Sequence, residues 1–410
     1  MEEMGLETTF DRFDAQQPQC TFGIAGTCCK NCFMGPCKIT KIPSWRVWRG
    51  RRFNCGQKSF ASVAAGTAAH GARGRESMLA LKFAAQGKAP IPIEGKEKIY
   101  AVCKNFGIET EGKTLNELAE QVADILLEDL SRTVPDKHKT IYSFAPKERV
   151  ETWEQLGIIP ISPSHEVFES LHRTTTGTDS DWRNVMQQFL RTGVSFAWSS
   201  CLGSSIAMDS LYGLPHRSRS KINLGALKKG YVNIAVHGHS PVLVSEIVKV
   251  GRSEKMVRLA KEKGALGIQF YGICCSGLSA MYRYDNVIPL SNAVGSELVL
   301  GTGALDLWVA DVQDVFPSIM EVAKCFRTTV VTTSDSGRLP GAEHYGLDHE
   351  HSNIGEIHQI AEKLYNAVLR AVERRDIPVK IPQYEVTLKW DFPWNSTALL
   401  EKGLQHWHRR

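Results

Sequence analysis

The spacing of apolar residues divides the chain near residue 228. Before this point the pattern is mainly helical. Thr114-Leu115-Asn116-Glu117 forms a capping box, which predicts a helix start. The apolar positions that follow recur at helical spacing, at Leu118, Val122, Ile125, Leu126 and Leu130. An Ala- and Gly-rich stretch from Ser59 to about Lys82 has side chains small enough to pack closely against a neighbouring element.

After residue 228, short runs rich in β-branched residues alternate with helical stretches. The runs cover Tyr231–Val236, Leu266–Tyr271, Leu305–Val312 and Thr328–Thr332. Ser240-Pro241 predicts a helix start, and Gly264 predicts the end of the helix that follows. This alternation predicts a parallel, doubly wound sheet. We therefore expect an α/β protein with an N-terminal helical domain over 1–227, one Rossmann-like domain over 228–375 and a C-terminal tail over 376–410.

Charge and composition narrow the class of protein. The net charge of +5 over 410 residues is small, and basic residues alternate with acidic ones, which argues against nucleic-acid binding. No stretch approaches the ~18–20 apolar residues that a membrane span needs. The start Met1-Glu2-Glu3-Met4 lacks the basic and apolar regions of a signal peptide. We expect a cytoplasmic protein, and in that reducing compartment eleven cysteines indicate metal binding or catalysis rather than disulfides.

Six of the eleven cysteines lie in the first 55 residues, at Cys20, Cys28, Cys29, Cys32, Cys37 and Cys55. Cys29-x2-Cys32-x4-Cys37 is a compact loop able to wrap a [4Fe–4S] cubane, and Cys55 supplies a fourth thiolate. The alternatives are a zinc site and buried thiols. Zinc usually takes two C-x2-C pairs, an arrangement that this segment lacks. The spacing therefore favours an iron–sulfur domain at the N-terminus.

Two cysteines of the array, Cys20 and Cys28, remain after the first cluster is assigned. Two thiolates do not complete a four-ligand cubane, but the same pair from a second subunit completes it across a twofold axis. This predicts a homodimer with a [4Fe–4S] cluster shared between subunits. The alternative is that both are thiols beside a cluster that they do not ligate.

Three metal-binding side chains follow predicted strands of the α/β half. His237, Cys275 and Asp314 each lie just past the carboxyl end of a run, where open α/β sheets place their ligand crevice. A single histidine at such a place is more often structural. A thiolate, an imidazole and a carboxylate together suit a mixed iron site.

The chain resembles the anaerobic nickel–iron carbon monoxide dehydrogenases. The segment Cys20-x7-Cys28-Cys29-x2-Cys32-x4-Cys37 carries the resemblance, together with Leu171–Thr174, Asn233–Pro241, Gly272–Gly277, Gly303–Asp306 and Pro340–His344. The resemblance implies that Cys20 and Cys28 hold the shared cluster and that Cys29, Cys32, Cys37 and Cys55 hold the cluster within each chain. It assigns His237 and Cys275 to the outlying iron of a nickel–iron–sulfur cluster.

Three departures from that family concern the active site. Asp314 stands where the family has a cysteine, and a carboxylate is a harder ligand than a thiolate. The family has a third α/β domain with three more cluster cysteines and a catalytic lysine, whereas this chain ends at Arg410. Its only cysteine after Cys275 is Cys325, which we expect to be buried within a helix. Of several family histidines on the helix after the second cluster, only His70 remains, as a catalytic acid or base or as a surface histidine.

Three functions stay open. The first is oxidation of CO with water to CO2, two protons and two electrons, which pass through the clusters to a ferredoxin-like acceptor. The second is reduction of a nitrogen oxide species such as hydroxylamine on an Fe–S–O hybrid cluster held by His237, Cys275 and Asp314, as in the related hybrid-cluster proteins. The third is a non-catalytic electron-transfer subunit.

Overall fold

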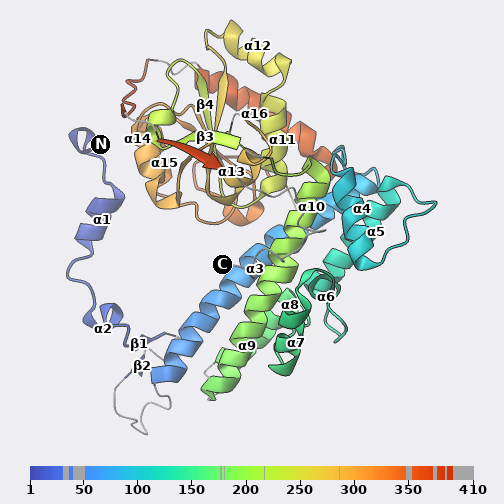
Figure 1. Cartoon of the computed structure of the whole chain (residues 1–410). Helices are drawn as coiled ribbons and strands as arrows, with labels where there is room; N and C mark the ends of the chain where they lie inside the picture. Colours follow the sequence, from blue (N-terminus) through green and yellow to red (C-terminus); the bar gives the residue numbers. More distant parts are fainter. Residues whose placement is uncertain are drawn as a thin grey trace. The chain divides into compact units, whose positions relative to one another are not determined.

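The computed structural model describes residues 1–30, 37–39, 51–175, 178–179, 181–216, 218–285, 287–347, 353–372, 376–383 and 386–390 (Figure 1). It forms two compact units, each built from separate parts of the chain. Unit 1 comprises Met1–Phe10, Ala80–Lys98 and Met208–Gly403, and unit 2 comprises Asp11–Leu79, Ile99–Ala207 and Leu404–Arg410. No helix among the described residues is long and apolar enough to cross a membrane.

Unit 2 is mainly helical. A short antiparallel ribbon, β1 (Cys28–Cys29) and β2 (Cys37–Lys38), follows the helices α1 (Thr9–Ala15) and α2 (Thr21–Ile24). The larger helices are α3 (Arg51–Ala85), α4 (Lys96–Phe106), α5 (Leu115–Ser131), α6 (Lys139–Phe144), α7 (Lys147–Gln155), α8 (Pro163–Thr174), α9 (Trp182–Ser195) and α10 (Leu202–Tyr212). A π-helix, η3 (Phe196–Cys201), joins α9 to α10. The predicted helical character of the first half is confirmed.

Helix α5 begins as predicted. The Thr114 hydroxyl oxygen accepts the Glu117 N–H at 3.3 Å, and the Glu117 carboxylate accepts the Thr114 N–H at 2.7 Å. These two bonds satisfy backbone groups that a helix start leaves open. The buried face of α5 includes the expected Leu118, Val122, Leu126 and Leu130, while Ile125 is half-buried.

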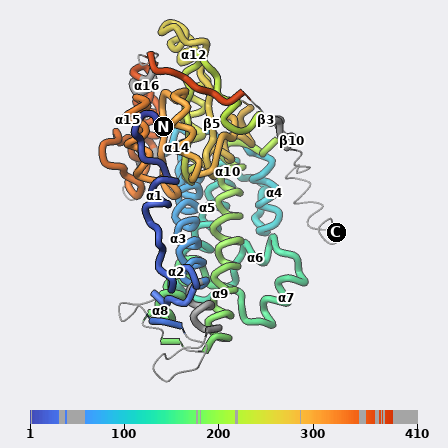
Figure 2. Tube along the Cα trace, turned by 90° about the vertical axis from the view of Figure 1, so that its left-hand side faces the viewer, coloured from blue at the N-terminus to red at the C-terminus, as the bar shows by residue number. Residues whose placement is uncertain are grey.

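The close packing predicted for the small residues of α3 is present against η3. A Cβ added at Gly74 would lie 3.0 Å from the Ser200 carbonyl oxygen, so the backbones of α3 and η3 nearly touch. The two segments run side by side in both views (Figures 1 and 2). Larger side chains at this position would push the helices apart.

Unit 1 contains a six-stranded parallel sheet in the order β6-β5-β4-β7-β8-β9. The strands are β4 (Val232–His237), β5 (Ile268–Ile273), β6 (Val287–Ser291), β7 (Leu307–Ala310), β8 (Thr329–Thr332) and β9 (Glu343–His344). Since β5 and β6 extend the sheet from one side of β4 and β7 to β9 from the other, the order reverses between β4 and β7. The doubly wound sheet predicted from the sequence is confirmed, and its topological switch point lies between these two strands.

Helices cover both faces of this sheet. Its helices are α11 (Pro241–Gly251), α12 (Glu254–Glu262), α13 (Cys274–Met281), α14 (Ser296–Gly301), α15 (Ile319–Cys325) and α16 (Ile357–Val372). Helix α11 packs on α16, and α14 packs on α15. Because parallel crossovers are right-handed, connections running in opposite directions from β4 lie on opposite faces. All six residues of β4 are buried, as expected for a central strand.

The predicted strands are present, with ends that differ from the prediction by at most two residues. The helix predicted between Ser240 and Gly264 is two helices, α11 and α12, separated at Arg252-Ser253. Strand β6 was not predicted because Pro289 interrupts its pattern, and proline is tolerated there since β6 is an edge strand. The antiparallel pair of β3 (Ser218–Ile222) and β10 (Val386–Trp390) was not predicted either.

The expectation for Cys325 is wrong. It is the last residue of α15 and is exposed, rather than buried in the middle of a helix. The reason is that α15 ends after seven residues, and Cys325 lies on its solvent side while Ile319, Val322 and Ala323 are buried.

Candidate metal centres

The carboxyl ends of β4, β5 and β7 bring the predicted metal-binding residues to one edge of the sheet. His237 is the last residue of β4, Cys275 is the second residue of α13, and Asp314 lies in the loop after β7. The N–H of Asp311, directly after β7, donates to the His237 carbonyl oxygen at 2.9 Å. The residues therefore surround the switch point, where sheets of this kind bind ligands.

His237 is a buried imidazole at the end of β4. Its ring packs edge-on against Trp308, with centroids 5.5 Å apart, and neither ring nitrogen makes a hydrogen bond of normal geometry with any of the described residues. Burial lowers the pKa of His237 to about 4, and the charge of Asp314 opposes that shift. The ring is thus neutral at pH 7, the form that binds metals. An unpaired buried polar group is unfavourable, so these nitrogens fit a site that a ligand completes.

Asp314 lies in a loop that curls back over β4. Gln313 and Asp314 are both left-handed, with φ of 69° and 56°, and the Asp314 side chain is 59% exposed. Its Oδ2 lies 3.5 Å from Nε2 of His239, whose side chain is only 7% exposed. Sequence reasoning missed His239, although the spacing His237-Gly238-His239 at a strand end was a usable signal.

Cys274 is a second residue that the sequence patterns did not identify. It has a φ of 59° at the sharp turn from β5 into α13. Burial, with Asp314 next in importance, raises the pKa of the Cys274 thiol to about 11. Cys274 directly follows β5 and so lies at the same carboxyl edge of the sheet as Asp314, and the neighbouring Cys275 is half-buried.

The start of α13 is held unusually close to β5. A Cβ added at Gly277 would lie 2.1 Å from the Cα of Gly272. Only glycine at both positions permits this approach. The glycines of the predicted motif Gly272–Gly277 therefore fix where Cys274 and Cys275 sit.

These residues do not form a preassembled metal site. Among the described residues, no three His, Cys, Asp or Glu side chains converge closely enough to hold one metal ion. The ligand roles of His237, Cys275 and Asp314 therefore stay predictions.

Asp311 is the buried carboxylate beneath this edge. Its Oδ1 accepts the N–H of His239 at 2.6 Å and the N–H of Val312, and its Oδ2 accepts the N–H of Ser240 at 3.2 Å and the hydroxyl of Ser276 at 2.6 Å. Burial raises the pKa of Asp311 to about 7, against these hydrogen bonds, which lower it. Sequence reasoning missed Asp311, although it directly follows a predicted strand.

Three of the N-terminal cysteines lie in the β1–β2 ribbon, and they are distributed over its two faces. Cys29 is paired with Cys37 across the ribbon, and Cys28 is paired with Lys38. Directly opposed residues share a face, whereas neighbours in a strand point to opposite faces. Cys29 and Cys37 therefore lie on one face of the ribbon, and Cys28 lies on the other. The division of the array between two clusters stays a prediction.

The other cysteines of the array are partly described. Cys20 precedes α2 and is exposed, and the backbone N–H groups of Gly23 and Phe22 lower the pKa of its thiol, although neither makes a capping bond of normal geometry. A lowered pKa favours the thiolate that binds iron. Cys32 and the side chain of Cys55 lie outside the described residues.

His70 lies in the middle of α3 and is half-buried. Its Nδ1 lies 3.0 Å from the carbonyl oxygen of Gly66, and its ring packs edge-on against Phe196 of η3 at 5.0 Å. The contact with η3 is notable because π-helices are frequent at functional sites. A role in catalysis stays a prediction.

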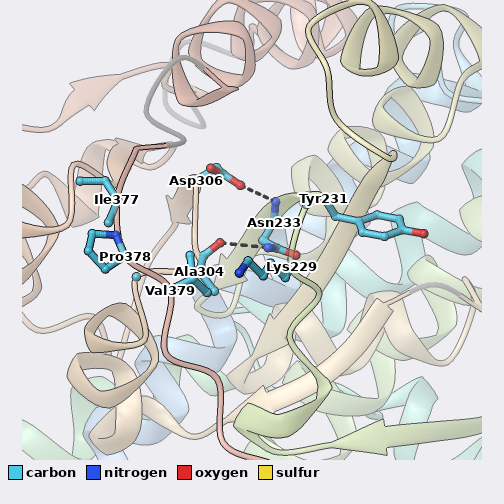
Figure 3. A pocket seen from close by; sticks show the side chains of 10 residues that line it. Lys229, Tyr231, Asn233, Ala304, Asp306, Ile377, Pro378 and Val379 are labelled. Carbon is cyan, nitrogen blue, oxygen red and sulfur yellow. Dashed lines mark hydrogen bonds between the residues drawn. The ribbon is translucent and has the colours of Figure 1, made fainter.

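A pocket of about 320 Å³ opens at the opposite, amino edge of the sheet (Figure 3). Asn233 and Asp306 line it from the amino ends of β4 and β7, and Ile377, Pro378 and Val379 form its other wall. The Asp306 carboxylate accepts the N–H of Asn233 at 2.8 Å. The pocket holds none of the predicted ligands, so it is separate from the candidate metal centre.

Comparison with known proteins identifies the family. The model of the Prismane/CO dehydrogenase family matches residues 27–386, and the chain therefore belongs to this family. It is 35% identical over 386 residues to carbon monoxide dehydrogenase of Rhodospirillum rubrum, covering 92% of this chain and 58% of that protein. It is 33% identical to carbon monoxide dehydrogenase 1 of Methanosarcina mazei, covering 92% of this chain and 60% of that protein.

Solved structures show the same fold. Carbon monoxide dehydrogenase IV of Carboxydothermus hydrogenoformans matches with a TM-score of 0.88 and 33% identity, over 95% of this chain and 62% of that one. The as-isolated, nickel-free enzyme from Thermococcus sp. AM4 matches with a TM-score of 0.89 and 32% identity, over 99% and 64%. The resemblance seen in the sequence is confirmed. The chain spans about 60% of the length of the curated relatives that it matches.

Proposed function

We propose that this chain is an oxidoreductase of the carbon monoxide dehydrogenase type. It would oxidise CO with water to CO2, two protons and two electrons, and pass the electrons to a ferredoxin-like acceptor. The observation that carries the proposal is His237, a neutral imidazole buried at the switch point of the sheet, whose ring nitrogens make no hydrogen bond of normal geometry within the described part of the chain. Family membership and the names of the relatives support it.

The proposed cofactors follow from the donor atoms. Cys29, Cys32, Cys37 and Cys55 would hold a [4Fe–4S] cluster within each chain, and Cys20 and Cys28 would hold one shared in a homodimer. The opposite faces of Cys28 and Cys29 support this division. His237, Cys275 and Asp314 would contribute ligands to a nickel–iron–sulfur cluster, the centre that the resemblance to the nickel–iron carbon monoxide dehydrogenases implies.

The chain's own residues would prepare this site. A bound nickel–iron cluster supplies redox chemistry and polarises CO and water. His237 and Cys275 would orient it from two neighbouring strands, and the apolar Trp308 beside His237 would keep bulk water from the imidazole. His70 would donate or accept protons. The proposed compartment is the cytoplasm of an anaerobic cell.

A second candidate is reduction of a nitrogen oxide species such as hydroxylamine. The observation in its favour is the Asp314 carboxylate beside His239, because a hard oxygen ligand suits an Fe–S–O cluster better than a sulfur-rich one. The third candidate is electron transfer without catalysis.

Assays with a viologen dye on one anaerobic preparation distinguish the three candidate functions. CO-dependent reduction of oxidised viologen supports carbon monoxide dehydrogenase activity, and hydroxylamine-dependent oxidation of reduced viologen supports the second candidate. Either activity should be lost in His237→Ala and kept in His216→Ala, an exposed histidine whose ring bonds to the Arg283 carbonyl and which is not among the predicted ligands. If neither activity is detected although both N-terminal clusters are present, the result supports the third candidate, electron transfer without catalysis.

A further inference from the structure

The carboxylate of Asp311 joins three loops that carry predicted ligands. It accepts backbone N–H groups from His239 and Ser240 after β4, the hydroxyl of Ser276 in α13, and the N–H of Val312 in its own loop after β7. Each of these donors lies within three residues of His237, Cys275 or Asp314. One buried carboxylate thus contacts every loop of the candidate centre.

The surrounding backbone is shaped to admit this carboxylate. Gly238 has a φ of 128°, and a Cβ there would lie 1.5 Å from Oδ1 of Asp311. A Cβ at Gly337 would lie 2.3 Å from the Asp311 carbonyl oxygen. The loops also bond to one another, since the Ser276 N–H donates to the Gly238 carbonyl oxygen at 2.9 Å. Side chains at either glycine would displace the loops from Asp311.

We propose that Asp311 is a positioning residue, which holds the segments that carry His237, Cys275 and Asp314 together at one edge of the sheet, where the proposed metal centre would be assembled. The claim that these loops bind a metal rests on the proposed function. The claim that Asp311 fixes the loops rests only on its hydrogen bonds. The four donors use both carboxylate oxygens, and a side chain of similar size without two acceptor oxygens cannot accept all four hydrogen bonds. Asparagine is isosteric, but its NH2 group would face N–H or O–H donors on one side.

Asp306 provides a matched control at the other end of β7. It is buried like Asp311, and its carboxylate accepts the N–H of Asn233 at the amino end of β4. The two aspartates therefore lie at the two ends of β7, and each accepts hydrogen bonds from β4 or from the loop that follows it. Asp306→Asn changes a buried carboxylate in the same sheet but far from the predicted ligands.

Hydrogen exchange of the metal-free protein tests the hold on the loops. In Asp311→Asn the amides of His239, Ser240 and Val312 should exchange at least about tenfold faster, while amides of β5 and β8 stay unchanged. In Asp306→Asn the Asn233 amide should change and those three should not. Unchanged exchange at the three amides in Asp311→Asn, or equal acceleration in both variants, would overturn the proposal.

Binding of Co2+ tests the consequence for the metal, with the absorbance of thiolate-bound Co2+ as the signal. The part of the signal lost in Cys275→Ala is assigned to this centre. Asp311→Asn should weaken that part by about 10- to 100-fold, the usual effect of removing a partner of a ligand loop, and Asp306→Asn should leave it unchanged. Equal weakening in both variants would show a merely structural role and overturn the proposal.

Two further outcomes keep the proposals distinct. If Asp311→Asn does not fold, Ser276→Ala removes one of the four donors and must still weaken the Cys275-dependent signal; unchanged binding would overturn the positioning role. If the unaltered protein shows no Cys275-dependent Co2+ signal, the proposed metal centre fails, whereas faster exchange at the three amides in Asp311→Asn still supports the hold on the loops.

Discussion

Nε2 of His239 lies 3.5 Å from Oδ2 of Asp314, and this contact joins the loop after β4 to the loop after β7. The two strands are neighbours at the point where the sheet reverses its order. The carboxylate that departs from the family pattern therefore has an imidazole partner that the sequence patterns did not select. Asp314 reaches it because two consecutive left-handed residues turn the loop back toward β4.

Replacing His237 by leucine should stabilise the metal-free protein. Leucine fills a similar volume and removes two buried nitrogens that make no hydrogen bond of normal geometry to the residues that the structure describes. We expect the free energy of unfolding to rise by about 1 kcal/mol, since an unpaired buried polar group costs ~1–3 kcal/mol. The Cys275-dependent Co2+ signal should disappear in the same variant. Urea denaturation checks the first part, and a clear loss of stability would show that His237 has a structural role.

Two pairs of N-terminal cysteines should differ in how much iron the protein loses when each pair is replaced. Cys20→Ser with Cys28→Ser should remove about two iron atoms per chain, half of a shared cubane. Cys29→Ser with Cys37→Ser should remove about four. Iron analysis of anaerobically purified variants, with size-exclusion chromatography for the dimer, provides the measurement. Equal losses from the two double variants would contradict the division that the faces of the ribbon suggest.

Stability should fall in acid because of His138. This buried residue caps α6, its Nδ1 accepting the Ile141 N–H at 3.3 Å, and it contacts Ser199 through Nε2. Burial lowers its pKa below the ordinary 6.5, partly opposed by Asp129. The unfolded chain therefore binds more protons than the folded one below pH 6.5, and the free energy of unfolding decreases as pH falls through that range.

Urea midpoints at several pH values between about 5 and 7 measure this effect. His138→Gln should be less stable at pH 7 but should lose less stability toward pH 5 than the unaltered protein. His172→Gln, which changes an exposed histidine, provides the control and should keep the original slope. A slope that His138→Gln leaves unchanged would assign the acid sensitivity to other groups.

Gly277→Ala should disturb the start of α13. The added Cβ would meet the backbone of Gly272, which cannot move without distorting β5. We expect a loss of about 1–3 kcal/mol in the free energy of unfolding, together with weaker Co2+ binding. Gly193→Ala in α9 is the control, because nothing lies within 4 Å of its added Cβ and alanine favours a helix. If both variants are equally stable, the close approach of α13 to β5 is not required.

Most of the sheet could be predicted from the sequence because its central strands are buried on both faces. Such strands appear as continuous apolar runs, and Tyr231–Val236 is followed by a clear helix start at Ser240-Pro241. The edge strand β6 contains Pro289, and β9 has only two residues, so neither gives a strong pattern. Strands β3 and β10 pair across more than 160 residues, which no local pattern reveals.

The candidate centre was predictable only in part. Position after a strand selected His237 and Cys275, because parallel strands end at a common edge. The same reasoning did not select Asp311, whose importance comes from four donors in separate loops. Nor did it select Cys274, whose left-handed backbone depends on the close packing of Gly272 on Gly277. These properties arise from tertiary packing.

Metal analysis of the anaerobically purified protein decides whether His237 and Cys275 belong to a nickel–iron–sulfur centre. We expect about one nickel atom per chain, iron beyond that of the N-terminal clusters, and CO-dependent viologen reduction, since the proposed centre contains nickel. His237→Ala should lose the nickel and the extra iron but keep the N-terminal clusters. Iron matching only those clusters, with no nickel and no CO-dependent reduction in a preparation supplied with nickel, would contradict it.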